Sequence, residues 1–382
     1  MRCEVGLAAV GSQPVVTVLI LTATVGEGHD LPARLLAESL AQERDVDVVV
    51  SDGLAPMGSL AETLNERVPS IIFFRWRWLY DPAFWIVAQF PPTRWVAQTL
   101  LGVIGGPRLR KLTEELDPSV VVSTYPPTTE ALGWLLRRGS LRTPVCAVIT
   151  DLAGLRYWAV RGVDLHLVTH PQSIPDARRI AGPKTTIRCV RGLIAAEFYR
   201  PRDRALARQA LQLPIEGKIV VVSGGGWGVG DVDAAIEEAL AVDEVVTVVC
   251  LCGRNDALRQ RLSRVYHGEE RVRVEPFTDV MAEWLAAVDA LVHSTGGLTV
   301  LESIIRGCPV ISFGWGRGHV RLNNQAYRRL GLARVADSRD ELRSELASAL
   351  TQTHHADLSF AELPSAADAV LALAHRAALS QP

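Results

Sequence analysis

Short β-branched runs alternate with stretches of helical periodicity along almost the whole chain of 382 residues. Such alternation builds parallel sheets, because two parallel strands are joined by a crossover that is usually a helix. The pattern occurs twice, on either side of a polar, proline-containing bridge at residues 192–203. Predicted strands occupy residues 15–21, 46–51, 120–123, 145–149, 165–168 and 186–190 before the bridge, and 219–222, 245–251, 271–274, 290–292, 310–313 and 333–335 after it.

These two series predict an α/β protein of two doubly wound, Rossmann-like domains that face a cleft. We expect one domain at residues 1–195, a second at 203–363, and a closing helix within 364–382 that packs back on the first domain. The first domain carries a helical insertion at residues 69–111, and its first helix is predicted over 31–42. Ligands of such sheets bind beyond the carboxyl ends of the strands, so the loops there are the candidates for a functional site.

Charge and cysteine content exclude several classes of protein. Forty basic residues against 42 acidic ones give a net charge of −2, which provides no overall basic field for nucleic acid. Six scattered cysteines without a C-x-x-C pair indicate buried thiols in a reducing compartment. No apolar run reaches the roughly 20 residues of a membrane-spanning helix. We therefore expect a cytoplasmic protein without a zinc or redox centre.

The first predicted strand runs into a glycine-containing loop that ends in a histidine, Thr-Ala-Thr-Val-Gly-Glu-Gly-His-Asp at residues 22–30. Gly26 and Gly28 allow the backbone to turn tightly and approach a ligand, and the following helix offers free N–H groups to an anion. His29 then faces the cleft. The alternative is a nucleotide-type glycine loop with an incidental histidine, but the third glycine of a dinucleotide motif is missing and Pro32 follows.

Two glycine-rich loops follow strands of the second half. The first, at residues 223–231, contains five glycines before a predicted helix. A plain turn does not need that many glycines, whereas a backbone cradle for phosphate does. We therefore predict contacts from Ser223, Gly225 and Gly226 to a phosphate group.

The second loop, at residues 293–303, combines the turn Gly296-Gly297 with a helix N-terminus. The main-chain N–H groups of Leu298 and Thr299 would there meet a diphosphate. One helical turn further on, Glu302 can accept hydrogen bonds from two neighbouring hydroxyls, as a ribose offers. The alternative for Glu302 is a capping-box glutamate.

Three blocks of the second half resemble the donor half of one glycosyltransferase family: residues 277–289, residues 294–302 and residues 306–310. That family comprises the monogalactosyldiacylglycerol synthases and the processive diacylglycerol glucosyltransferases. It is more distantly similar to the N-acetylglucosaminyltransferase that makes lipid II. The Gly-Glu-Gly-His loop at 26–29 looks like the family's acceptor-side signature. Residues 123–126, 150–152 and 158 match in order and spacing.

This resemblance implies the GT-B fold and an inverting transfer of a hexose from a UDP-sugar to an acceptor hydroxyl, with no cofactor besides that co-substrate. The implied donor contacts are Phe277, Thr278 and Met281 for uracil, Glu302 for the ribose, Gly296, Gly297, Leu298 and Thr299 for the diphosphate, and Gly318, His319 and Asn323 for the sugar and the α-phosphate. The chain departs from the family at His319-Val320, where a Gln-Glu pair is usual, and at Leu155, where a histidine is common. The first departure concerns the choice of sugar and the second that of acceptor.

Inverting transfer needs a base for the acceptor hydroxyl and stabilisation of the departing UDP. We predict His29 as the base, since an imidazole titrates near neutral pH. Asp151 is the second-choice base or the carboxylate that orients His29. Glycine-loop N–H groups, a helix dipole and Arg254 or Arg317 would stabilise the leaving group. We expect the transfer to need no metal.

Tryptophan is concentrated in the insertion at 69–111, where six basic residues stand against a single acid, Asp81. Aromatic and arginine side chains suit the headgroup layer of an anionic membrane, whereas an ordinary buried helical insertion is the alternative. The candidates for contact with membrane or acceptor are Trp76, Trp78, Trp85, Trp95 and, outside the insertion, Trp158.

The expected partners are a UDP-sugar donor and a lipid or small-molecule acceptor, with peripheral contact at an anionic membrane on the inner face of the plasma membrane and no nucleic acid. Three alternatives stay open. The acceptor could be a small-molecule aglycone. A UDP-sugar epimerase shares this fold and needs no acceptor. A non-catalytic carbohydrate or regulatory binding protein would have no need for His29.

Overall fold

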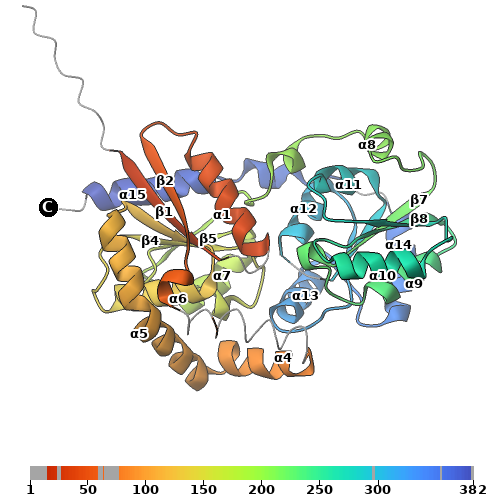
Figure 1. The fold of residues 1–382 in the computed structure, drawn as a ribbon. Helices are drawn as coiled ribbons and strands as arrows, with labels where there is room; N and C mark the ends of the chain where they lie inside the picture. Colours follow the sequence, from red (N-terminus) through yellow and green to blue (C-terminus); the bar gives the residue numbers. More distant parts are fainter. Residues whose placement is uncertain are drawn as a thin grey trace, which may run out of the picture.

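The computed structural model describes residues 15–23, 27–58, 63, 77–294, 297–352 and 355–379. These residues form two α/β domains, each built on a six-stranded parallel sheet (Figure 1). The strand orders are β2-β1-β3-β4-β5-β6 and β12-β11-β10-β7-β8-β9. The prediction of two doubly wound, Rossmann-like sheets is thereby confirmed, and it holds because the alternating pattern runs through both halves of the chain.

The strands of the first sheet are apolar and largely buried, since helices cover both faces of the sheet. They are β1 (Val16–Thr22), β2 (Val46–Asp52), β3 (Val120–Ser123), β4 (Val145–Ile149), β5 (Leu165–Val168) and β6 (Thr186–Cys189). The main helices between them are α1 (Glu27–Leu40), α6 (Pro126–Arg137) and α7 (Ile174–Ala181). One core lies between the sheet and α1, and the other between the sheet and α6.

The first helix begins earlier than the sequence predicts. We expected it from residue 31, because Gly28 and Pro32 both disfavour helix. In the structure α1 starts at Glu27 and includes Pro32, so His29 lies in its first turn. Pro32 has no N–H to pair with the Gly28 carbonyl, and in the same turn the hydroxyl of Thr22 donates to the carbonyl of His29.

The second sheet follows the same plan with helices on both faces. Its strands are β7 (Lys218–Ser223), β8 (Val245–Leu251), β9 (Val272–Glu275), β10 (Ala290–His293), β11 (Val310–Ser312) and β12 (Arg334–Val335). Its helices are α9 (Val232–Leu240), α10 (Asp256–Val265), α11 (Met281–Ala287), α12 (Leu298–Arg306), α13 (His319–Leu330) and α14 (Arg339–Thr351).

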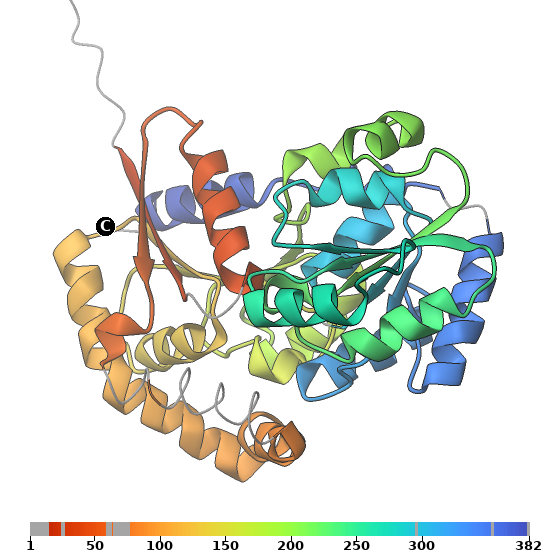
Figure 2. The same ribbon diagram turned by 45° about the vertical axis from the view of Figure 1, so that its right-hand side comes forward.

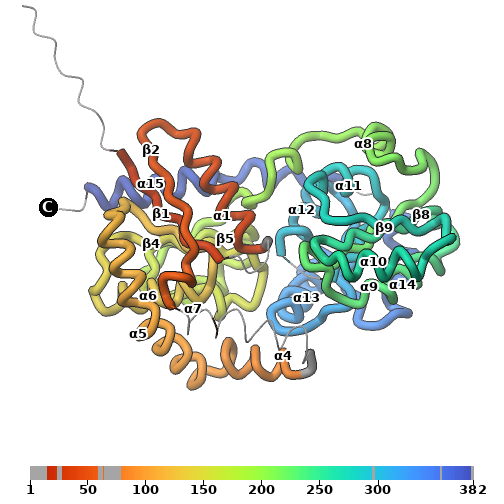
Figure 3. The backbone as a smooth tube through the Cα atoms, viewed as in Figure 1, coloured from red at the N-terminus to blue at the C-terminus, as the bar shows by residue number. Residues whose placement is uncertain are grey.

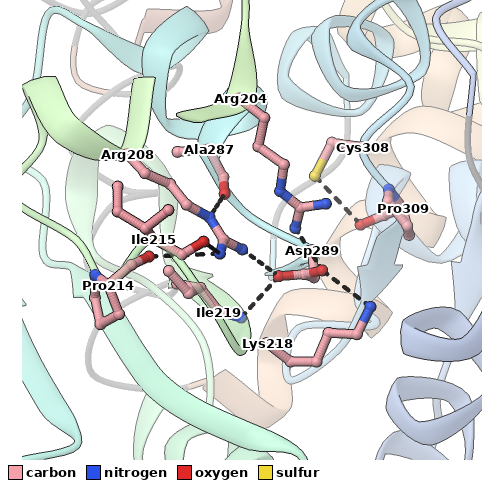
Figure 4. A network of polar contacts seen from close by, with 10 residues as sticks. All are labelled: Arg204, Arg208, Pro214, Ile215, Lys218, Ile219, Ala287, Asp289, Cys308 and Pro309. Carbon is pink, nitrogen blue, oxygen red and sulfur yellow. Dashed lines mark hydrogen bonds and ion pairs between the residues drawn. The ribbon is translucent and has the colours of Figure 1, made fainter. Parts of the chain in front are cut away.

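The buried carboxylate of Asp289 connects the first helix of the second domain to this sheet. Asp289 accepts hydrogen bonds from Arg208, at 2.8 Å, and from the main chain of Ile219, at 2.9 Å (Figure 4). Arg204 and Lys218 also pair with it. Burial alone would raise the pKa of Asp289, but these partners hold it below its usual value. The network fixes α8 (Arg204–Ala210) against the start of β7.

The chain returns to the first domain at its end. After α14 it passes through a short 3₁₀ helix (Leu358–Glu362) into α15 (Ala366–Leu379). In Figure 2 this last helix lies with the first domain, behind α1. Val370 and Leu373 of α15 are buried in the core that β1 and α1 line. Helix α15 therefore belongs structurally to the first domain.

The described part of the insertion is helical and runs beyond residue 111, to Leu116. Its described part comprises α4 (Arg77–Phe84), a π-helix (Trp85–Gln89) and α5 (Pro91–Leu116). Helix α5 packs closely on α6, since a Cβ on Gly102 would lie only 2.2 Å from the Trp134 ring. Helix α4 extends from there toward the second domain and ends beside α13 (Figures 1 and 3).

Candidate active site

His29 lies where the carboxyl ends of β1 and β3 meet. Its Nδ1 is 3.1 Å from the main-chain oxygen of Thr124. A carbonyl oxygen only accepts, so Nδ1 carries the proton of the neutral ring and Nε2 keeps its lone pair. Burial lowers the pKa of His29 to about 4, against the opposing effects of the Asp151 charge and the Thr124 hydrogen bond. The ring is therefore neutral at pH 7, the form that a base requires.

Two aromatic rings flank this imidazole. The Tyr125 ring lies 5.0 Å away, edge to face, and the Trp158 ring lies 5.3 Å away. Trp158 is 5% exposed, and its Nε1 donates to Oδ2 of Asp151 at 2.8 Å. The sequence assigned Trp158 to acceptor contact. In the structure its indole packs beside His29 and positions Asp151.

Asp151 joins the two domains. Its Oδ1 accepts a hydrogen bond from Nδ2 of Asn323, on α13 of the second domain, at 2.9 Å. The amide oxygen of Asn323 accepts in turn from the N–H of Ala153, at 2.8 Å. Asn323, predicted to contact the donor, is thus fully buried in an interdomain bridge. Asp151 acts on His29 through its charge, while the hydrogen bond that orients the imidazole goes to Thr124.

The N-terminus of α12 faces Asp151 across the domain boundary. Gly297 caps this helix with a φ of 90°, a conformation that favours glycine, and a Cβ there would lie 3.7 Å from Oδ1 of Asp151. Leu298 and Thr299 form the first turn, whose N–H groups have no partner within a helix. The N–H of Gly297 lies 3.3 Å from the hydroxyl of Tyr327, a residue that sequence reasoning missed. Gly296 lies outside the described residues.

Glu302 is buried one turn into α12. A capping-box glutamate would stand at the third helical residue behind a Ser or Thr cap, but α12 begins at Leu298 behind Gly297. The capping alternative therefore does not fit this helix. Burial, with a smaller effect of Glu197, raises the pKa of Glu302 to about 8. A buried carboxyl held this far from its usual pKa is a candidate ligand-binding group.

The glycine loop after β7 folds into a 3₁₀ turn (Gly225–Trp227). The N–H of Gly225 lies 3.2 Å from the Ser223 hydroxyl, and the carbonyl of Gly226 accepts from the Arg254 N–H at 2.8 Å. A Cβ on Gly253 would lie 2.4 Å from the Gly225 oxygen, so the two loops need glycine where they cross. The predicted cradle residues therefore meet the loop after β8.

Side chains predicted to hold uracil gather at the start of α11. The Arg254 guanidinium lies over the Phe277 ring, 4.0 Å from its centroid. The Thr278 hydroxyl accepts from Nε1 of Trp284 at 3.1 Å. Met281 is the first residue of α11 and packs against the domain core. Arg254 thus lies beside the predicted uracil wall.

Helix α4 of the insertion contacts the loop predicted to read the sugar. Asp81 accepts from the N–H of Gly318 at 2.6 Å and pairs with Arg321. A Cβ on Gly318, whose φ is 57°, would lie 2.5 Å from the Tyr80 ring. The ring of His319 lies 6.3 Å from that of Phe84. No sequence pattern indicates these contacts.

Two aspartates near the cradle form the sequence Asp231-Val232-Asp233, but they are engaged elsewhere. Asp231 caps α9 by accepting from the N–H of Ala234. Asp233 forms a two-pronged ion pair with Arg261 at 2.6 and 2.7 Å. Within the described ranges, no group of three or more His, Cys, Asp or Glu side chains is arranged to hold a metal ion.

The insertion presents apolar side chains to solvent. Trp85 is 41% exposed and Trp95 is 67% exposed. We call them, with the neighbouring exposed side chains, the apolar band: Trp85, Ile86, Val87, Phe90, Trp95, Val96, Leu100 and Val103. Trp76 and Gly26 lie outside the described residues, as does the side chain of Trp78, while Gly28 is exposed in the first turn of α1. None of the helices in the described ranges combines the length and hydropathy that crossing a bilayer requires.

Two α/β domains on six-stranded parallel sheets, with the N-terminus of α12 facing Asp151 across their boundary, fit the GT-B class of glycosyltransferase folds. Residues 29–190 match the monogalactosyldiacylglycerol (MGDG) synthase family, and residues 219–377 match the C-terminal domain of glycosyltransferase family 28. Together these matches span most of the chain. The chain therefore carries an MGDG synthase family domain followed by a glycosyltransferase family 28 C-terminal domain.

Relatives and solved structures agree with this assignment. A processive diacylglycerol β-glucosyltransferase of Bacillus subtilis is 24% identical over 87% of this chain and 86% of its own length. One from Staphylococcus carnosus is 24% identical, over 67% of this chain and 65% of its own length. The structure of MurG from Acinetobacter baumannii shares the fold, with a TM-score of 0.55, 14% identity, and coverage of 94% of this chain and 99% of its own.

Proposed function

We propose that this enzyme transfers a hexose, with inversion, from a UDP-sugar to the hydroxyl of a diacylglycerol-type lipid at a membrane surface. The observation that carries the proposal is His29, a neutral imidazole whose Nδ1 is fixed by the Thr124 carbonyl and whose Nε2 is the basic nitrogen. The relatives named as diacylglycerol glucosyltransferases support the lipid acceptor, and the apolar band supports contact with a membrane.

The proposed reaction has one chemical step. Nε2 of His29 takes the proton of the acceptor hydroxyl while that oxygen attacks the anomeric carbon. The bond from the anomeric carbon to the β-phosphate oxygen breaks, and its electron pair leaves with UDP. The N–H groups of Leu298 and Thr299 at the start of α12 stabilise the charge that develops on the diphosphate. The Asp151 charge, which already raises the pKa of His29, stabilises the imidazolium that forms.

Donor binding is proposed to use the second domain. Glu302, buried with a raised pKa, accepts hydrogen bonds from the ribose hydroxyls. Phe277 and Arg254 form a stacked wall for the uracil. The glycine loop at residues 223–226 supplies main-chain contacts near the diphosphate, and metal-independent transfer is part of the proposal. Turnover abolished by EDTA and restored by a divalent cation would contradict that part.

The test is incubation of the protein with UDP-glucose, UDP-galactose or UDP-N-acetylglucosamine, with and without extracted bacterial lipids. We expect UDP release only with lipid present, and a product whose mass is that of diacylglycerol plus one or more hexoses. His29→Ala should keep donor binding and lower transfer by about 10²–10⁴-fold. Unchanged transfer in that variant would overturn the role of His29.

Two other functions predict different results in the same assay. A transferase for a small-molecule aglycone shares the proposed chemistry and predicts UDP release with soluble hydroxyl compounds but not with lipid. A UDP-sugar epimerase predicts interconversion of UDP-sugars with no acceptor added. The apolar band favours the lipid acceptor over both, because neither alternative needs eight exposed apolar side chains on one helical insertion.

A further inference from the structure

A pocket lies on the side of the first domain where α5, α6 and α7 approach one another. Its volume is about 660 Å³, within the range of small-molecule sites. Six of the side chains that line it are arginines: Arg94, Arg137, Arg138, Arg156, Arg161 and Arg179. They come from four separate segments of the chain, and it is the tertiary fold that brings them together. We call this site the arginine pocket.

Few carboxylates compensate these six charges. Among the described contacts, Arg94 pairs with Glu130 and Arg179 pairs with Asp176. Two carboxylates, Glu130 and Asp176, thus stand against six guanidinium groups. The arginine pocket therefore carries a clear excess of positive charge.

The other four guanidinium groups contact neutral partners. Arg137 donates to the carbonyl of Arg161, Arg161 to that of Ile180, and Arg156 to that of Gln89. Arg138 lies over the Trp134 ring, 4.3 Å from its centroid. Carbonyls and rings orient a guanidinium but cancel none of its charge. Like charges held together in this way repel one another unless an anion joins them.

An apolar pocket of about 630 Å³ adjoins the arginine pocket. The two share Pro91 and Arg156, and the second is lined by Trp85, Ile86 and Phe90 of the apolar band. These three side chains are between 41% and 56% exposed. A charged pocket that continues into an apolar one matches a molecule with an anionic head and an apolar tail.

We propose that the arginine pocket binds the phosphate headgroup of an anionic phospholipid, whose acyl chain lies along Trp85, Ile86 and Phe90. Guanidinium groups present paired N–H donors that fit phosphate oxygens, which favours phosphate over a diffuse negative surface. The apolar continuation favours a lipid over a free phosphate. This inference rests on the proposed function only in placing the protein at a membrane. It assigns a lipid site separate from the acceptor site beside His29.

The test measures binding of the full-length protein to vesicles of phosphatidylcholine with and without phosphatidylglycerol. Arg138→Gln and Arg161→Gln remove charges from two walls of the arginine pocket, and both residues are exposed, so the fold should survive. The matched control is Arg178→Gln, which removes an exposed charge from α7 beside Arg179 but outside the pocket. Thermal unfolding of each variant checks that it is folded.

We expect each pocket variant to lose phosphatidylglycerol-dependent binding by about tenfold, and the control to lose no more than the roughly fivefold that one surface charge contributes at a membrane. Equal losses in pocket and control variants would mean a diffuse basic surface and would overturn the proposal. Soluble glycerol 3-phosphate should compete only weakly with vesicles. Competition as strong as by lipid would overturn the lipid assignment in favour of a free phosphate ester.

Transfer activity separates this inference from the proposed function. Arginine-dependent vesicle binding without UDP release would uphold the arginine pocket and overturn the proposed transferase. The opposite outcome is UDP release with detergent-dispersed diacylglycerol together with vesicle binding that is unchanged in the Arg138 and Arg161 variants. That outcome would uphold the proposed transferase and overturn the arginine pocket.

Discussion

The carboxylate of Asp81 accepts a hydrogen bond from the main-chain N–H of Gly318 at 2.6 Å, across the boundary between the two domains. Asp81 is the only acidic residue among residues 69–111, and Gly318 caps the helix that carries Asn323. The segment proposed to contact the membrane is thus bonded directly to the loop proposed to read the donor. Lipid contact and donor binding are expected to influence each other through this bond.

Replacing Asp81 by Asn tests that connection. The variant keeps the shape of the side chain but loses the charge that pairs with Arg321. Hydrogen bonds to charged groups contribute about 1.5–3 kcal/mol, so we expect the donor KM to rise about tenfold with a smaller change in kcat. Steady-state kinetics over UDP-sugar concentration measures this. Asp340→Asn, exposed on α14, is the control, and an equal effect in that variant would count against the contact.

The pH dependence of kcat at saturating UDP-sugar, where the effect of Glu302 on donor affinity does not enter, tests the state of His29. A base must be unprotonated, and the pKa of His29 is lowered to about 4, so activity should be lost only as pH falls toward 4 and not near the ordinary value of 6.5. Asp151→Asn removes a charge that raises this pKa, so the acid limb should move to still lower pH. An acid limb near 6.5 in the wild-type enzyme would contradict the burial of this imidazole.

Asn323→Asp should create repulsion between two carboxylates at the domain boundary. The new carboxylate would face Oδ1 of Asp151, which the native amide meets at 2.9 Å, and two buried like charges at that distance cannot both ionise cheaply. We expect a drop in kcat/KM of about a hundredfold at pH 8 that partly recovers as pH falls, because protonation of one carboxyl restores a hydrogen bond. Asn324→Asp serves as control, since Asn324 contacts Ser312 and not Asp151. Recovery at low pH in both variants would refute the explanation.

The raised pKa of Glu302 predicts that donor affinity depends on pH. Its pKa of about 8 means that the carboxyl is mostly protonated at pH 7 in the free enzyme, and the ionised form is the stronger acceptor for hydroxyls. Affinity for UDP-glucose should therefore increase as pH rises through 8. Calorimetric titration from below to above that pKa measures it. Glu302→Gln should bind more weakly and show no such increase; a flat profile in the wild-type protein would exclude Glu302 as the ribose ligand.

The sheets could be predicted from sequence almost residue by residue, because a buried strand needs a β-branched run whatever surrounds it. Strands such as β3, β4, β5 and β8 have the predicted bounds. The start of α1 could not be predicted in this way, since the helix propensities of Gly28 and Pro32 are low. The tertiary fold supplies what propensity lacks, as the Thr22 bond to the His29 carbonyl illustrates.

The candidate site was only partly predictable for a related reason. Residues such as His29, Glu302 and Gly297 stand in loops or helix starts whose local pattern marks them. Asp81 and Tyr327 do not, because their roles depend on partners that only the assembled domains bring near. Asp81 and Gly318 are 237 positions apart in sequence. Asn323 was found by pattern, but its partner Asp151 lies 172 positions away.

The return of α15 to the first domain has a consequence for biosynthesis. Val370 and Leu373 complete a core whose members in β1 and α1 leave the ribosome more than 300 residues earlier. The first domain must therefore wait, with part of its interior uncovered, until the whole second domain has been translated. Truncation before α15 should leave the second domain folded and the first domain prone to aggregation, although α15 follows the second domain in sequence.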